Sequence, residues 1–84
     1  MHYVYMLYSL KDHMLYIGFS DNLRIRVVQH IEGKVRATKH RLPLELIYYE
    51  AYKDKRDATK REYFLKSGRG RELIKSLLKH SLPR

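Results

Sequence analysis

The carboxylate of Glu62 is a candidate for a chemical role because of its position in the sequence. In the helix that we expect around it, residue 62 follows Ala58 by four positions and precedes Leu65 by three, at the edge of the stripe that faces the sheet. A carboxylate there is costly unless it is paired, open to a cleft or bound to a metal ion. An ion pair, with Arg61 or another base, is the commoner explanation of an isolated glutamate. A lone carboxylate that does bind metal suits Mg²⁺ better than Zn²⁺, because Mg²⁺ keeps several waters and takes further ligands from substrate phosphates.

Arg26 and His30 form a second candidate pair. They are four residues apart and therefore lie on one side of the helix that we expect over this segment. They flank Leu23 and Val27 on its apolar face, so both point toward the rim of the sheet. Arginine offers a planar fork that matches phosphate oxygens, and histidine titrates near neutrality and can move a proton. Each also fits a structural role, Arg26 as one surface cation of many and His30 as a helix-end histidine near the negative pole of the dipole.

Two tyrosines on neighbouring predicted strands, Tyr5 and Tyr16, could supply phenols to the same place. Core packing explains either one alone, because tyrosine is a common strand residue. A chemical role requires a phenol pKa below the ordinary value of about 10, and Arg26 together with a basic loop could lower it. A tyrosine tuned in this way could accept a proton from water.

The cations of this chain outnumber its anions. Lys and Arg total 18 and Asp and Glu total 9 in 84 residues, which gives a net charge of +9 and favours a polyanionic partner, nucleic acid first. Two clusters are typical of phosphate contacts that position a backbone rather than read bases, although solvated charge explains them as well. The first is a loop with Lys34, Arg36, Lys39, His40 and Arg41, and the second surrounds a helix break with Lys66, Arg69, Arg71 and Lys75.

The elements that must position these side chains follow from the apolar pattern. We expect strands at 3–10 and 14–19, joined by a polar turn at 11–13 into an antiparallel hairpin. A helix capped by one of residues 20–22 follows, with Leu23, Val27, Val28 and Ile31 as its apolar face, and Gly33 ends it. After the loop at 34–41 come a strand at 42–51, a helix from Asp54 or Asp57, a break at Gly68 and Gly70, and a helix at about 71–78 with its leucines and Ile74 facing inward.

This order, β-β-α-β-α-α, predicts an α+β fold in which a three-stranded antiparallel sheet is flanked by helices. The length of 84 residues predicts a single domain, 1–84. The absence of cysteine excludes disulfides and thiolate zinc sites. The sequence shows no secretion signal and no apolar run long enough to cross a bilayer, so we expect a cytoplasmic protein without a membrane partner.

The order of the candidate residues resembles the GIY-YIG nuclease family over nearly the whole chain. It is most similar to small single-domain members related to the N-terminal nuclease domain of excinuclease C. The second half-motif, Tyr16-Ile17-Gly18, matches in full, and the segment from Ala58 to Glu62 followed by Leu65-Lys66 is similar to the glutamate helix of the family. The Gly-Ile of the first half-motif is replaced by Tyr3-Val4, and Phe19 stands where some members have lysine.

The resemblance implies roles for individual residues. It makes Tyr5, Tyr16 and Arg26 catalytic, places a frequently found histidine at His30, and makes Glu62 the ligand of one Mg²⁺ or Mn²⁺ ion. Gly18 would allow a close backbone approach at the site. The implied activity is a metal-dependent DNA endonuclease of low sequence specificity, or one directed by DNA structure, in DNA repair or processing.

Two alternatives stay open. The chain could be a catalytically weak nucleic-acid-binding module, or a nuclease subunit with a protein partner. RNA as the substrate and a homodimer are also open.

Overall fold

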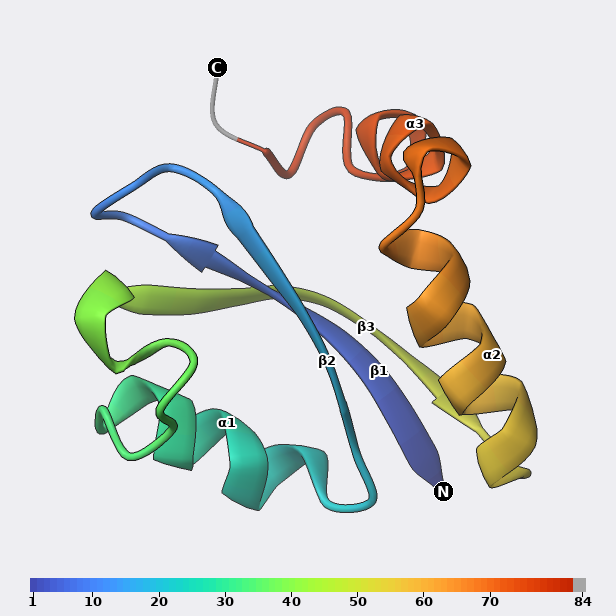
Figure 1. Cartoon of the computed structure of the whole chain (residues 1–84), viewed down its shortest axis with the longest axis horizontal. Coiled ribbons are helices and arrows are strands. Elements are labelled where there is room, and N and C mark those ends of the chain that lie inside the picture. The colour runs from blue at the N-terminus through green and yellow to red at the C-terminus, as the bar shows by residue number, and fades with distance from the viewer. Residues whose placement is uncertain (83–84) are drawn as a thin grey trace.

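A computed structural model describes residues 1–82 (Figure 1). Its sheet has three antiparallel strands, with β1 (His2–Ser9) between β2 (Leu15–Ser20) and β3 (Leu44–Tyr52). In the β1–β2 hairpin, Tyr5 is opposite Gly18 and Leu7 is opposite Tyr16, which makes the two tyrosines diagonal neighbours. The predicted α+β fold and its order of elements are confirmed.

Helices cover both faces of the sheet, because alternate residues of the central strand point to opposite sides. Val4 and Met6 belong to a core shared with Ala58 and Leu65 of α2 (Lys55–Leu65), and α3 (Gly68–Leu77) packs on the same side. Tyr5 and Leu7 face the other side, where α1 (Leu23–Ile31) lies. No helix among residues 1–82 has the length and apolar character needed to span a membrane.

The ends of α1 follow the sequence, but its inward face does not. The Asn22 side chain accepts a hydrogen bond from the Ile25 amide at 3.2 Å, and Gly33 follows the helix with a positive φ of 76°. The prediction that Val28 and Ile31 face inward is wrong, because both are about half exposed. The stripe toward the sheet instead contains Leu23, Arg26, Val27 and His30, which share the i, i+3, i+4, i+7 spacing of one helix face.

The predicted break at Gly68 and Gly70 is also wrong in detail. Both glycines belong to the first turn of α3, which Ser67 caps by accepting a hydrogen bond from the Gly70 amide. A Cβ at Gly70 would overlap the Phe64 carbonyl oxygen, so this glycine allows α3 to begin directly against the end of α2. Ile74 and Leu78 are buried as expected, whereas Leu77 is 44% exposed.

Candidate active site

Three buried side chains form a hydrogen-bonded chain where β1 meets α1. The Tyr5 hydroxyl lies 2.7 Å from Nε2 of His30, and Nδ1 of His30 lies 2.7 Å from Oγ1 of Thr38. Tyr5 is 1% exposed, and His30 and Thr38 are fully buried. Because both ring nitrogens are occupied, the imidazole has one orientation and holds the Tyr5 phenol in place. Thr38 is a member of this site that the sequence did not reveal, since it stands in a basic loop with no motif around it.

Burial keeps both members of the Tyr5–His30 pair neutral at pH 7. It raises the pKa of Tyr5 to about 12, and the nearby Arg26 guanidinium only partly offsets this increase. Burial, with a smaller contribution from the charge of Arg26, lowers the pKa of His30 to about 4. The expectation that nearby cations bring the phenol pKa of Tyr5 below 10 is therefore wrong, because the loss of hydration outweighs the one guanidinium.

Tyr16 is the more accessible of the two phenols. Its ring centroid lies 6.4 Å from that of Tyr5 and 5.1 Å from that of His30, and its side chain is only partly buried at the edge strand β2. Gly18 makes this cluster of rings fit, because a Cβ there would lie 2.5 Å from Cζ and Oη of Tyr5 and 3.0 Å from Cε2 of Tyr16. The glycine thus matters here for the space it leaves beside the rings.

Arg26 belongs to α1 and Glu62 to α2, two helices on opposite faces of the sheet. The charges of both groups act on the pKa of Tyr5, as does the phenol of Tyr16, so all lie within electrostatic range of the Tyr5 hydroxyl. Arg26 also donates to Oε1 of Gln29 at 3.3 Å. The Glu62 carboxylate pairs with Lys66 at 3.0 Å and remains partly exposed. The fold therefore brings the rings of Tyr5, Tyr16 and His30 together, with Arg26 and Glu62 close enough for their charges to act on the Tyr5 hydroxyl.

Comparison with known proteins gives the same assignment. Residues 1–75 match the GIY-YIG catalytic domain. The chain belongs to the GIY-YIG family. A UPF0213 protein of Staphylococcus epidermidis is 38% identical over 77 residues, which cover 90% of this chain and 93% of that protein. A UPF0213 protein of Clostridium perfringens is 42% identical over 67 residues, which cover 79% and 71% respectively.

A solved relative extends the comparison to the fold. The solution NMR structure of a UPF0213 protein from Bacillus halodurans superimposes with a TM-score of 0.59 at 34% identity, and the match covers 98% of this chain and 87% of that one. GIY-YIG domains form a nuclease family that acts on DNA, so the cluster around Tyr5 is the candidate active site of this GIY-YIG chain.

The ion pair that the sequence offered as an alternative for Glu62 exists, but its partner is Lys66. Arg61 turns to the other side of α2 and forms two hydrogen bonds with Glu50 of β3, at 2.9 and 3.0 Å. Glu50 also accepts hydrogen bonds from the hydroxyls of Tyr48 and Tyr52, at 2.7 and 2.6 Å. This largely buried carboxylate ties α2 to β3 and thereby helps to fix the helix that carries Glu62.

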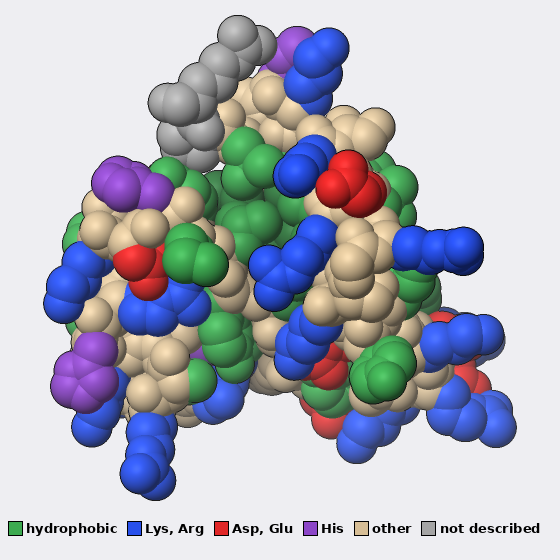
Figure 2. Space-filling model, turned by 45° about the horizontal axis from the view of Figure 1, so that its top comes forward, with side chains coloured by type: hydrophobic (Ala, Val, Ile, Leu, Met, Phe, Trp, Pro, Cys, Tyr) green, Lys and Arg blue, Asp and Glu red, His purple; other side chains and the backbone are tan. Residues whose placement is uncertain are grey.

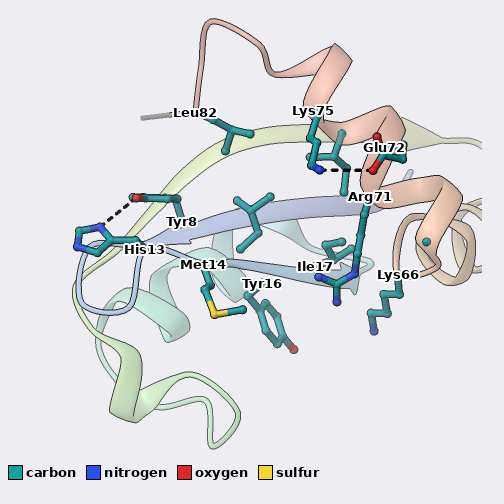
Figure 3. Close-up of a pocket in the computed structure, with 13 residues that line it drawn as sticks. Tyr8, His13, Met14, Tyr16, Ile17, Lys66, Arg71, Glu72, Lys75 and Leu82 are labelled. Carbon is teal, nitrogen blue, oxygen red and sulfur yellow. Dashed lines mark hydrogen bonds and ion pairs between the residues drawn. The ribbon is translucent and has the colours of Figure 1, made fainter. Parts of the chain in front are cut away.

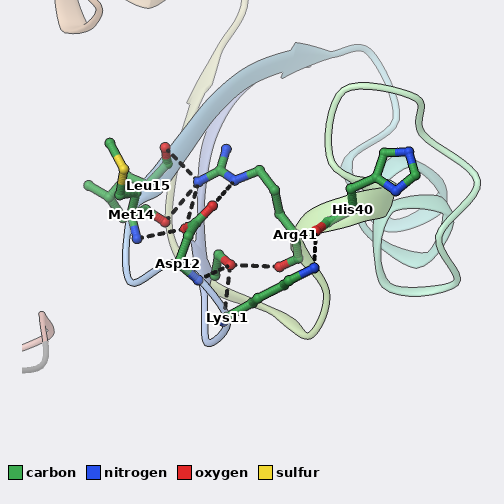
Figure 4. A network of polar contacts seen from close by, with 7 residues as sticks. Lys11, Asp12, Met14, Leu15, His40 and Arg41 are labelled. Atoms are coloured by element: carbon green, nitrogen blue, oxygen red, sulfur yellow. Dashed lines mark hydrogen bonds and ion pairs between the residues drawn. The ribbon is translucent and has the colours of Figure 1, made fainter.

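The predicted phosphate contacts fall into groups with different surroundings. Arg41 precedes β3 in the chain, and its side chain reaches the turn between β1 and β2. There its guanidinium pairs with Asp12 and donates to the carbonyl oxygens of Met14 and Leu15 (Figure 4). Lys34 pairs with Glu32 at 3.2 Å. The other cations of these clusters, Arg36, Lys39, His40, Lys66 and Arg69, are exposed. These seven residues, together with the exposed Arg71 and Lys75, remain predicted nucleic-acid contacts, although most donors of Arg41 already bind atoms of the turn.

Glu62 is the residue of this site that would hold a metal ion. Among residues 1–82 no group of three or more His, Asp or Glu side chains is arranged to hold an ion. This arrangement does not fit Zn²⁺, which takes at least three protein ligands. It fits Mg²⁺ or Mn²⁺, because Glu62 is a partly exposed carboxylate whose lysine partner is itself exposed and can move aside.

Proposed function

We propose that this GIY-YIG chain is a DNA endonuclease that hydrolyses phosphodiester bonds with one Mg²⁺ or Mn²⁺ ion bound to Glu62. The observation that supports the proposal is the packing of the Tyr5 and Tyr16 rings beside one another, within range of the charges of Arg26 and Glu62. A net charge of +9 favours the approach of DNA to this edge.

The two phenols have different roles in this proposal. Tyr5, with a pKa of about 12 and a hydroxyl held by His30, stays protonated at neutral pH and orients the attacking water through its oxygen lone pairs. Tyr16 is the phenol that substrate can reach, so we assign it the role of general base. His30 is a positioning residue, because its low pKa makes it a weak base and its buried ring touches Tyr5 rather than the surface.

The remaining groups stabilise the negative charge that develops during the reaction. Arg26 stabilises the negative charge that builds up on the phosphoryl oxygens. The chemistry that an ion on Glu62 supplies is Lewis-acid stabilisation of a non-bridging oxygen and of the leaving 3′ oxygen. Without cysteine the chain has no zinc finger to read bases, so we propose cleavage directed by DNA structure, in DNA repair or processing.

A cleavage screen with a matched pair of variants tests the proposal. Purified protein is incubated with duplex, single-stranded, flap and junction DNA in Mg²⁺, Mn²⁺ or a chelator. We expect metal-dependent products, their loss in Glu62→Gln, and normal cleavage by Glu32→Gln, which removes another glutamate that pairs with a lysine. Circular dichroism checks that both variants are folded. DNA binding without any metal-dependent product would refute the endonuclease and favour a binding module.

A further inference from the structure

An open groove lies between β2 and α3, on the face of the sheet opposite α1 (Figure 3). Its floor is apolar and consists of Leu15 and Ile17 of β2, Ile74 of α3 and Leu82. Met14 stands at its mouth and is 58% exposed. Figure 2 shows an apolar hollow of this kind beside a row of Lys and Arg side chains. An open apolar surface bordered by charged side chains is a candidate binding site.

The rim toward α3 is basic. Lys66, Arg71 and Lys75 line it and are exposed, and in Figure 3 the head groups of Lys66 and Arg71 point to the same opening as Tyr16. Lys66 and Lys75 each pair with a glutamate, at 3.0 and 3.4 Å. Arg71 has no carboxylate partner among residues 1–82, so its guanidinium is available to an incoming anion.

An apolar floor beside cations matches the two parts of a nucleotide, a base with apolar faces and a phosphate. Tyr16 connects this groove to the candidate active site, because it lines the groove and also packs against His30 and Tyr5. A strand whose scissile phosphate lies at Tyr16 can therefore pass around the edge strand β2 and continue into the groove on the other face. An acidic peptide would match the positive charge of the rim, but it would have no reason to bind beside the candidate active site.

We propose that the groove is a subsite for one unpaired nucleotide next to the scissile phosphate. The base lies on the apolar floor beside Met14, and Arg71 holds its phosphate. The inference rests on the proposed function only for the position of the scissile phosphate at Tyr16. A base in an intact duplex must first be unstacked and unpaired to enter, whereas a flap, gap or junction presents one already free. The subsite would thus make a discontinuity in the duplex the feature that this protein recognises.

Binding without metal separates this subsite from catalysis. Two probes, a hairpin duplex and the same hairpin with one unpaired 2-aminopurine at a flap, are titrated by fluorescence anisotropy in chelator. We expect the flap probe to bind about fivefold more tightly, the change in affinity that burial of roughly 40 Å² of apolar surface contributes. The 2-aminopurine emission should change on binding. Met14→Ser should remove this preference. Arg71→Gln should remove it and lower the salt slope by about 0.7, the value for one lost phosphate contact in a single strand.

The matched control is Lys60→Gln, which removes an exposed cation of α2 that neither lines the groove nor belongs to the predicted nucleic-acid contacts. It should leave the ratio of the two affinities unchanged. Equal affinities in the wild type, or a preference that survives both Met14→Ser and Arg71→Gln, would overturn the subsite. Because no metal is present, a preference of this kind would stand even if the cleavage screen found no activity, so the two proposals fail independently.

Discussion

A methyl group added at Gly18 should displace the Tyr5 phenol. The new Cβ would lie 2.5 Å from Cζ and Oη of Tyr5, whereas carbon atoms in contact are normally about 3.5–4.0 Å apart. The ring or the strand must therefore move by roughly 1 Å. Tyr5 has little room to yield, because it is 1% exposed and its hydroxyl is held 2.7 Å from His30.

The expected cost of Gly18→Ala has two parts. Overpacking of this kind lowers the free energy of unfolding by about 1–3 kcal/mol. In a domain of this size each kcal/mol lowers the Tm by about 4–8 °C, which thermal unfolding followed by circular dichroism will resolve. In the proposed endonuclease, a displacement of about 1 Å at the water-orienting phenol should also lower kcat by up to about 100-fold at temperatures where the variant is folded.

Gly68→Ala is the matched control, because no atom lies within 4 Å of the Cβ that it would add. It should stabilise the protein slightly, by up to about 1 kcal/mol, since alanine lowers the entropy of the unfolded chain. If Gly18→Ala melts at the wild-type temperature and cleaves DNA at the wild-type rate, then the ring cluster around Gly18 is not tightly fixed, and the positioning role of Tyr5 fails.

Three further changes test the groups that support the site. His30 has a pKa lowered from 6.5 to about 4, so the unfolded chain binds more protons between these values, and stability should fall as the pH drops through that window. The free energy of unfolding, measured with urea, should be lower at pH 4.5 than at pH 7 by up to about 3 kcal/mol. This difference should largely disappear in His30→Gln. Thr38→Val leaves Nδ1 of the buried His30 imidazole without a hydrogen-bond partner and should lower the free energy of unfolding by about 1–3 kcal/mol. It should also lower kcat more than it changes KM, and Thr38→Ser should restore both properties. Equal stability of Thr38→Val and the wild type would contradict the hydrogen-bonded chain. Arg61→Gln leaves the largely buried Glu50 carboxylate without its cation and should lower the free energy of unfolding by about 2 kcal/mol or more. Arg56→Gln, which breaks an exposed ion pair, should lower it by less than about 1 kcal/mol. Comparable Tm values for these two variants would disprove the tie between α2 and β3.

The site residues differ in how far local pattern could find them. Tyr16, Gly18 and Glu62 stand in short segments with family signatures, and their neighbourhood follows once the order of strands and helices is known. Thr38 and Glu50 have no such signature. Their roles depend on contacts with His30 and Arg61, which are 8 and 11 residues away in the chain and on other elements.

The face of α1 shows why a hydrophobic pattern alone misplaced a helix. Counting apolar residues puts Ile31 inside, but the sheet offers a phenol at Tyr5 that needs a hydrogen-bond partner once it is buried. Turning His30 inward satisfies that hydroxyl and leaves Ile31 half exposed. A polar contact across two elements thus outweighed the burial of one isoleucine.

The amino-acid sequence by itself determined the elements, their order and the family, because strand alternation, helix caps and half-motifs are properties of neighbouring residues. Only the tertiary structure decided which phenol is buried and protonated, which glutamate ties α2 to the sheet, and where an apolar groove opens beside Tyr16. These features depend on burial and on contacts between distant segments, and a pKa or a groove does not exist until the segments have packed together.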